Sequence, residues 1–390
     1  MTGAMYAAVS GLKTHMSAMN VISNNISNVN TLAYKATRYT FNEALYTTVR
    51  SGSNGNDSMG GQNPAQVGYG CSVGTIDLDM STKNYNPTGQ GLDVMIDGDG
   101  FFVVGTDKTN NGITTQSQLQ GMKLSRLGNF TFDPNGYLVD GNGSLVYGFL
   151  RMMSVDDANA DAANDGSEEM MCSPVLTPIR YPNCVISSVE SEDEADGESQ
   201  STQKVQTTIL WPKIDDNDGS VRDGSVGDAE DDAFPEGSVA TRLQPNSVSI
   251  DKTGCITAIT KDEKLVVVGY VALASVDSPN GVTHVDGRYY QALGGAGNVH
   301  LTTVGGAFTH IPGGEDEGGG GEEEGGLGTS ELTVESAGGT ALVTGGLESS
   351  GTDLAQEITN MIVIQRGYQA NTRIVTVTDS MLEELVNMKR

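Results

Sequence analysis

Histidine is scarce in this sequence, and its copies are spread too widely to form a known catalytic or metal-binding motif. The histidines are His15, His284, His300 and His310, and none has the HExxH spacing of a zinc protease. The chain also lacks a G-x-S-x-G nucleophile elbow, a phosphate-binding Walker loop, and a dinucleotide-binding GxGxxG segment after a strand. We therefore expect no enzyme, with no catalytic residue, no cofactor-binding residue and no metal ligand.

One acidic segment, residues 214–219, resembles a calcium-binding loop in composition. The first ligand position of the D-x-[DN]-x-[DN]-G pattern is filled by Ile214, which offers no side-chain oxygen. A solvated acidic loop is therefore the preferred interpretation of this segment.

The cysteines are few and scattered. None belongs to a CxxC pair, so we interpret them as separate small apolar side chains: Cys71, Cys172, Cys184 and Cys255. A disulfide between Cys172 and Cys184 in an oxidising environment stays open as the less favoured alternative.

The charge balance argues against several classes of partner. The chain has 22 Lys plus Arg against 50 Asp plus Glu, a net charge of −28, which repels phosphate backbones and anionic lipids. Its apolar stretches fall short of the ~18 residues that a membrane span needs. We expect neither nucleic-acid binding nor membrane insertion. The opening segment, MTGAMYAAVSGLKTHM, lacks the basic and apolar regions of a secretory signal, so we expect none that is cleaved.

Two segments near the chain ends, 1–30 and 352–390, have the periodicity of amphipathic helices. Apolar residues in the first recur at spacings of four and three, and the second carries a heptad-like stripe after a capping pair formed by Asp353 and Gln356. Two helices could cover these faces by pairing within one chain or by packing among many copies, and periodicity does not distinguish the two. The residues that we expect to make assembly contacts are Met5, Val9, Leu12, Met16, Met19, Ile22, Asn24, Asn25, Ile26, Leu354, Ile358, Met361, Tyr368, Ile374, Val375, Met381, Leu382, Leu385 and Val386.

Between these helices the sequence alternates as strands and turns. Residues 92–96 and 101–104 flank the turn 98–100 and predict a hairpin. Further strands are expected at 137–139, 145–150, 247–250, 256–260 and 265–274, separated by turn sequences at 133–136, 140–143 and 251–254. The predicted fold is multidomain: a mainly β body of two β-rich domains, one inserted in the other, with N- and C-terminal amphipathic α-helices that form a coiled-coil-like axial domain.

Acidic charge is concentrated in two places. Residues 151–243 hold 21 acidic and six basic side chains, and 313–326 hold six acidic and no basic ones, which predicts a flexible, exposed, Gly-rich loop there. The domains expected from this pattern are a helical axial domain (1–30 and 352–390), a connecting and bracing segment (31–70), a discontinuous β domain (71–150 and 244–351) and an inserted acidic outer β domain (151–243).

Four stretches of the chain resemble the bacterial flagellar rod and hook family. The first, AVSGLKTHMSAMNVISNNISNVNTLAYKATRYTF, contains the SNNISN-x-NT-x-x-(Y/F)K pattern of that family. The others are TGQGLDVMIDGDGFFVV, SRLGNFTFDPNGYLVD, and the segment from LESSGTDLAQEI to the ending ELVNMKR, all in the family's order. Only 151–243 and about 297–340 lack a counterpart. The ending and the large insertion are more similar to hook subunits than to rod subunits.

The resemblance implies a structural subunit of the flagellar hook, which polymerises outside the cell into a hollow curved tube and transmits motor torque as a flexible joint. It implies export through the flagellar type III apparatus and contact with identical copies, rod proteins, the hook cap and the hook–filament junction. In such a tube the terminal helices line the channel, residues from about 31 to 70 brace neighbours, and the acidic insertion lies at the outer radius. A distal rod subunit is the alternative within the family. A calcium-dependent extracellular adhesin and a hydrolytic enzyme are the alternatives from other classes.

Two local features are expected to weaken the helices. Gly11 and Gly367 each cost about 1 kcal/mol relative to alanine in a helix interior. Residues 350–352, Ser-Gly-Thr, stand where the family commonly has Asn-Val, which is expected to loosen the start of the second helix.

Overall fold

The computed structural model describes residues 2–54, 60–106, 112–113, 115–152, 172–173, 175–191, 202–214, 221–225, 239–304, 334–336 and 339–388. The chain divides into two compact units, which are described separately here. Unit 1 comprises Met1–Lys83 and Ser349–Arg390, and unit 2 comprises Asn84–Glu348. The loop predicted at 313–326 and much of the acidic insertion lie outside the described residues.

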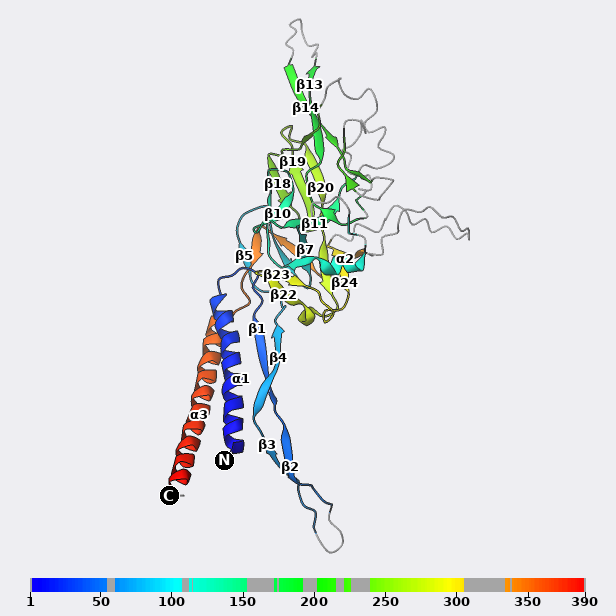
Figure 1. The fold of residues 1–390 in the computed structure, drawn as a ribbon. Helices are drawn as coiled ribbons and strands as arrows, with labels where there is room; N and C mark the ends of the chain where they lie inside the picture. Colours follow the sequence, from blue (N-terminus) through cyan, green and yellow to red (C-terminus); the bar gives the residue numbers. More distant parts are fainter. Residues whose placement is uncertain are drawn as a thin grey trace, which may run out of the picture. The chain divides into compact units, whose positions relative to one another are not determined.

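Unit 1 consists of two long helices and one extended β ribbon (Figure 1). The helices are α1 (Thr2–Ser27) and α3 (Leu354–Asn387). In the ribbon, β1 (Thr37–Glu43) pairs with β4 (Cys71–Leu78), and β2 (Tyr46–Arg50) pairs with β3 (Ala65–Gly68), both antiparallel. Backbone hydrogen bonds from Ala44 to Gly70 and from Tyr69 to Leu45 join the two pairs into one continuous ribbon. None of the described helices is long and apolar enough to cross a membrane.

The start of α3 is capped where the sequence predicts it. The Asp353 carboxylate accepts hydrogen bonds from the backbone N–H groups of Ala355 (2.9 Å) and Gln356 (3.2 Å), which have no partner within the helix. The Gln356 side chain does not complete the expected capping pair, because it donates to Asn360 further along the helix.

Residues 350–352 hold this helix start in place. The Ser350 hydroxyl donates to the carbonyl of Asn28 (2.9 Å), and the Gly351 N–H donates to the carbonyl of Tyr34 (2.8 Å). Both bonds connect the beginning of α3 to the segment that follows α1. The expectation that these residues loosen the helix start was therefore wrong, because their small polar groups bind the neighbouring backbone.

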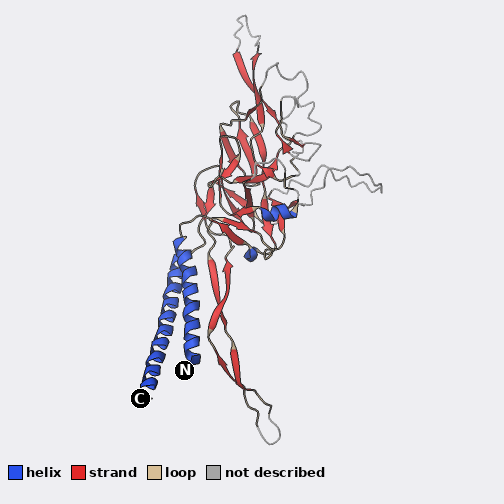
Figure 2. Cartoon of the chain, viewed as in Figure 1, coloured by secondary structure: helices blue, strands red, loops and turns tan. Residues whose placement is uncertain are grey.

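Unit 2 is built mainly from short strands (Figure 2). Its first half contains β5 (Tyr85–Pro87), β6 (Asp93–Asp97), β7 (Phe101–Gly105), the short helix α2 (Gln116–Gly121), β8 (Lys123–Ser125), β9 (Gly128–Phe132), β10 (Leu138–Asp140), β11 (Leu145–Leu150) and β12 (Thr177–Pro178). Its second half contains β18 (Ser247–Ile250), β19 (Cys255–Ile259), β20 (Leu265–Val271), β21 (Leu273–Val276), β22 (Thr283–Asp286), β23 (Tyr289–Gln291), β24 (Val299–Thr303), β25 (Val334–Ser336), β26 (Ala341–Thr344) and β27 (Gly346–Glu348).

Within the described residues, these strands join into a branched sixteen-stranded array and a separate β5–β27 pair. The main path runs β22-β23-β8-β7-β11-β10-β9-β6-β26, and β20, β19 and β18 continue from β11. Its core is apolar, with Phe102, Phe130 and Ile256 almost wholly buried. Burial of such side chains stabilises the unit by roughly 1.5–3 kcal/mol each. The predicted fold class, a mainly β body with helices at the two chain ends, is confirmed.

The predicted hairpin between β6 and β7 does not form, although both strands do. β6 lies between β9 and β26, whereas β7 pairs with β8, β11 and β21. The chain turns a corner between them at Gly98 (φ 117°) and Gly100 (φ 142°), a backbone conformation that favours glycine. The alternating sequence located the strands and the turn, but strand partners depend on residues far away in the chain.

The inserted segment adds two small sheets to unit 2. β13 (Asn183–Ser191) pairs with β14 (Thr202–Leu210) and with β17 (Thr241–Arg242), and β15 (Lys213–Ile214) pairs with β16 (Val221–Arg222). The Asp223 carboxylate binds both Arg180, which is fully buried, and Arg242, which is partly exposed. This ion-pair cluster fixes both ends of the β13–β17 segment to each other.

The four cysteines are all free thiols, so the Cys172–Cys184 disulfide does not form. Cys172, Cys184 and Cys255 are buried. Burial, together with the nearby Cys255, raises the pKa of Cys172 to about 12. These side chains are therefore neutral at physiological pH and act as small apolar groups.

Candidate assembly surface

The two helices of unit 1 pack antiparallel along a seam of small and polar side chains. A Cβ atom added at Gly11 would stand 2.6 Å from the Asn371 side chain, and one added at Gly367 would stand 2.8 Å from the His15 ring. Each helix thus provides a glycine against which a polar side chain of the other helix rests. The cost of these glycines in helix propensity is offset by the close approach that they allow.

The α1 side of this seam has regular heptad spacing. Its residues recur at intervals of three and four: Ala8, Gly11, His15, Ala18, Ile22 and Asn25. Ala18 and Ile22 pack with Ile364 of α3 as a small apolar core. Sequence analysis missed most of this seam because it searched for large apolar residues. The informative signal is the same heptad spacing of Ala and Gly.

Asn25 connects three segments of unit 1 through its side-chain amide. Its Nδ2 group donates to the carbonyl of Thr37 (2.8 Å) and to the Glu357 carboxylate of α3 (3.0 Å). Its Oδ1 atom accepts from the Thr37 N–H (3.0 Å), from the Thr37 hydroxyl (3.2 Å) and from the Tyr34 hydroxyl (3.0 Å). The residue is 1% exposed, so α1, α3 and the start of β1 are held together by a buried amide.

Lys35, ten residues after Asn25, also connects two segments of unit 1 through its side chain. Its side chain is buried, and Nζ donates to the backbone carbonyls of Met80 (3.3 Å) and Ser81 (2.9 Å) just beyond β4. Burial raises the pKa of neighbouring Tyr34, which therefore stays neutral and donates to Asn25. Tyr34, Lys35, Thr37 and Glu357 were not among the predicted site residues, although Tyr34 and Lys35 lie in the family-like pattern.

Outside the seam, α3 exposes an unusual amount of apolar surface. Eleven of its large apolar side chains are at least 37% exposed: Leu354, Ile358, Ile362, Val363, Tyr368, Ile374, Val377, Met381, Leu382, Leu385 and Val386. Soluble monomers seldom expose apolar patches on this scale without a partner to cover them. Figure 2 shows that α3 is one continuous helix over this whole length.

Several of these exposed residues lie on two flanks of α3, one on each side of the seam. At 100° per residue, Leu354 and Ile358 fall on one flank, whereas Ile374 and Met381 fall on the other. The face opposite the seam carries Ile362 together with Arg366, Arg373 and Glu384. Only one side of the helix is therefore covered within the chain, and two further sides are apolar.

Leu382, Leu385 and Val386 continue the seam beyond α1. The register that places Asn25 beside Glu357 and Gly11 beside Asn371 puts Thr2 near residue 380. The last turns of α3 therefore extend past the described start of α1, with their apolar side chains exposed.

The structure places the remaining predicted assembly residues as follows. Ile22 and Asn25 are buried inside unit 1, and the half-buried residues are Val9, Leu12, Met19, Ile26, Met361 and Val375. The exposed ones on α1 are Met5, Met16 and Asn24. That these residues contact other subunits stays a prediction.

The β ribbon of unit 1 also exposes large apolar side chains. They lie on both pairs of strands and the links between them: Phe41, Leu45, Tyr46, Val49, Val67, Tyr69 and Ile76. α1 covers part of the β1–β4 pair, where the His15 ring packs edge-on against Phe41 and the Thr14 hydroxyl donates to the Cys71 carbonyl. The apolar side chains of the ribbon nevertheless stay exposed, which makes it a second apolar surface of unit 1.

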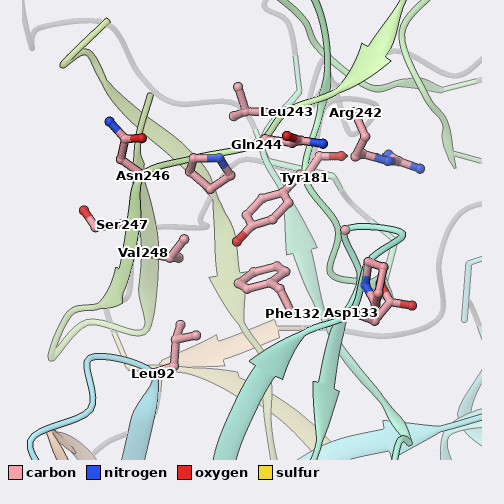
Figure 3. Close-up of a pocket in the computed structure, with 13 residues that line it drawn as sticks. Leu92, Phe132, Asp133, Tyr181, Arg242, Leu243, Gln244, Asn246, Ser247 and Val248 are labelled. Atoms are coloured by element: carbon pink, nitrogen blue, oxygen red, sulfur yellow. Dashed lines mark hydrogen bonds between the residues drawn. The ribbon is translucent and has the colours of Figure 1, made fainter. Parts of the chain in front are cut away.

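Unit 2 has an open cavity of about 430 Å³ lined by residues of β9, β17 and β18 (Figure 3). Phe132 and Tyr181 stack on its floor with ring centroids 4.0 Å apart. Its charged groups are already engaged: Asp133 accepts from the Tyr137 N–H, and Arg242 donates to the Tyr181 carbonyl and to Asp223. Within the described part of the chain, no group of three or more His, Cys, Asp or Glu side chains is placed to hold a metal ion.

Comparisons with known proteins match both ends of the chain to flagellar families. Residues 5–35 match the family "Flagella basal body rod protein", and residues 343–388 match "Flagellar basal body rod FlgEFG protein C-terminal". These two matches cover α1 with the Asn25 and Lys35 contacts, and β27 with α3.

Whole-chain relatives carry rod and hook names. The chain is 28% identical over 391 residues to the flagellar basal-body rod protein FlgG of Bacillus subtilis, with 100% of both chains covered. It is 23% identical over 483 residues to the flagellar hook protein FlgE of Borreliella burgdorferi, again with 100% of both chains covered. It is 34% identical over 154 residues to the hook protein FlgE of Helicobacter mustelae, which covers 39% of this chain and 31% of that protein.

The fold and its exposed helical faces are those of a structural protein whose apolar helix surface is available for contact with other subunits. These matches support a flagellar hook or rod axial protein, a structural subunit of the flagellar axis. Similarity to this family implies assembly into a polymer together with other axial proteins of the flagellum.

Proposed function

We propose that this chain is the subunit of the flagellar hook and that the two flanks of α3 are its main contacts with neighbouring copies. The observation that carries the proposal is the distribution of apolar surface on α3, which is covered by α1 on one side and exposed on two others. A helix with three apolar sides fits a position inside a bundle of many helices.

The magnitude of the burial supports association. Covering one large aliphatic side chain contributes roughly 1.5–3 kcal/mol. Even a few of the exposed residues on each flank would offset much of the entropy lost when a subunit joins a polymer, which is about 4–15 kcal/mol. Repetition of the contact along a helical assembly then makes each added subunit favourable.

The inserted segment favours a hook over a rod. It builds two separate small sheets of its own, β13–β14–β17 and β15–β16, and β12 joins it to β11 of the main array. Such a large insertion is more similar to hook subunits than to rod subunits, and its acidic charge suits a position at the outer surface of the polymer. A distal rod subunit is the second candidate, favoured by the full-length similarity to FlgG.

Electron microscopy of polymers assembled from the purified full-length chain distinguishes these two functions. A hook subunit is expected to form hollow tubes that supercoil, because a flexible joint must bend as it turns. Straight, stiff tubes would support the rod function instead. Export through the type III apparatus and contact with cap and junction proteins follow from the same proposal.

A further inference from the structure

A buried arginine of unit 2 connects three segments that are far apart in the sequence. Arg126 is 2% exposed and lies between β8 and β9. Its Nη1 atom donates to the carbonyl of Gly100 (2.5 Å), and its Nη2 atom donates to the carbonyls of Gly98 (2.5 Å) and Ile96 (3.3 Å). The guanidinium thus fills the corner between β6 and β7, where a hairpin was expected.

The third segment is the end of unit 2. Arg126 Nε donates to the carboxylate of Glu348 at 3.3 Å, and the Glu348 side chain is 1% exposed. A buried carboxylate is tolerated only when a positive partner and hydrogen bonds compensate for the lost water. Glu348 is the last residue of β27 and of unit 2, and Ser349 begins the stretch of unit 1 that leads to α3.

β27 itself lies outside the sixteen-stranded array. Within the described residues it pairs with β5, whose three residues are all exposed, and it packs against β6. Its own three residues are buried, and it follows a turn at Gly345 (φ 80°) that connects it to β26. The units have two covalent connections, Lys83–Asn84 and Glu348–Ser349, and the second carries the force that α3 transmits to unit 2 along its own stretch of chain.

We propose that Arg126 is a positioning residue for load transfer, which clamps Glu348 and the end of β27 to the glycine corner at 98–100. From the proposed function this inference takes only that the subunit bears load in a polymer. An arginine suits the task because its planar fork binds a carboxylate and several backbone carbonyls at once, which a lysine cannot do. Without the clamp, β27 would separate from unit 2 before the core strands yield.

Hydrogen exchange on the full-length soluble chain tests the clamp without requiring assembly. In Arg126→Met, the amides of β27 and β5 are expected to exchange about tenfold faster or more, whereas those of β19 and β20 keep their rates. Arg126→Lys is expected to recover part of the protection, because it keeps the charge beside Glu348 but not the bridge to the carbonyls. Glu348→Gln provides the same test if Arg126→Met does not fold.

Arg180→Met is the matched control, because Arg180 is also a fully buried arginine of unit 2 with an acidic partner. It is expected to speed exchange in β13 and β17 and to leave β27 unchanged. Unchanged exchange of β27 in Arg126→Met, or an equal increase in every strand of unit 2, would overturn the proposal.

A pulling measurement tests the load itself. With handles attached at the exposed positions Leu265 and Met388, the wild-type chain is expected to release β27 at a higher force than Arg126→Met does. Equal forces would refute load transfer through the clamp. A failure of the chain to form tubes would contradict the proposed function but leave both of these results standing.

Discussion

At the scale of single residues, unit 1 is organised by buried polar groups. Asn25 and Lys35 each donate to backbone carbonyls of neighbouring segments, and Asn25 also reaches Glu357 of α3. Such contacts have defined geometry, so they fix the angle and register of the helices more narrowly than apolar packing alone. In a polymer, a shift in the angle or register of the helices would be repeated in every subunit. A fixed register therefore matters more than it would in a monomer.

Replacing Asn25 by alanine is expected to destabilise unit 1 by about 2 kcal/mol or more, because it leaves the Thr37 N–H and carbonyl without partners. Thermal unfolding followed by far-ultraviolet circular dichroism measures this, since α1 and α3 supply nearly all the described helix. Asn20→Ala is the control: Asn20 is an exposed residue of α1 and should change stability by less than about 0.5 kcal/mol. Equal losses in the two variants would contradict the assigned role of Asn25.

Residue roles of this kind were only partly predictable from sequence. The sequence indicated that Asn25 matters, through the family-like pattern, but it gave no reason to connect Asn25 with Glu357, which lies 332 positions away. Likewise, Gly11 and Gly367 looked unfavourable in isolation, and their role becomes visible only when Asn371 and His15 are seen against them.

At the scale of elements, α3 is a helix with more apolar surface than its own chain can cover. The sequence predicted both terminal helices and the Asp353 cap, because periodicity and capping are local properties. It also located several strands of unit 2, including β18 and β19 with their turn. It could not predict the separation of β6 from β7, because the Arg126 side chain that fills their corner comes from another part of the chain.

A charge introduced on the flank of α3 that carries Leu354 and Ile358 should prevent assembly without affecting folding of the monomer. Ile358 is 46% exposed, so Ile358→Lys is expected to change monomer stability by no more than about 0.5 kcal/mol. The same change should prevent polymer formation, because an unpaired charge would be buried between subunits. Glu384→Lys is the matched control at an exposed position on the face opposite the seam. Sedimentation of both variants measures the outcome, and normal tubes from Ile358→Lys would exclude this flank as a contact.

At the scale of the whole molecule, charge and apolar surface are segregated along the chain. The first 42 residues contain no acidic side chain, whereas 151–243 carry a net charge of −15. Identical copies of the first 42 residues can pack closely without repulsion between acidic groups. Identical copies of 151–243 repel one another because of their negative charge. This segregation matches a polymer with apolar helices packed together at the centre and acidic segments spread apart at the surface.

Removal of residues 354–390 tests the central claim, that the apolar flanks of α3 are completed by neighbouring subunits, most directly. Electron microscopy of the full-length chain and of the truncated chain under the same conditions should show tubes for the first and only monomers for the second. Thermal unfolding of the truncated chain should show that the transition of unit 2 is retained. Tubes formed by the truncated chain would contradict the account.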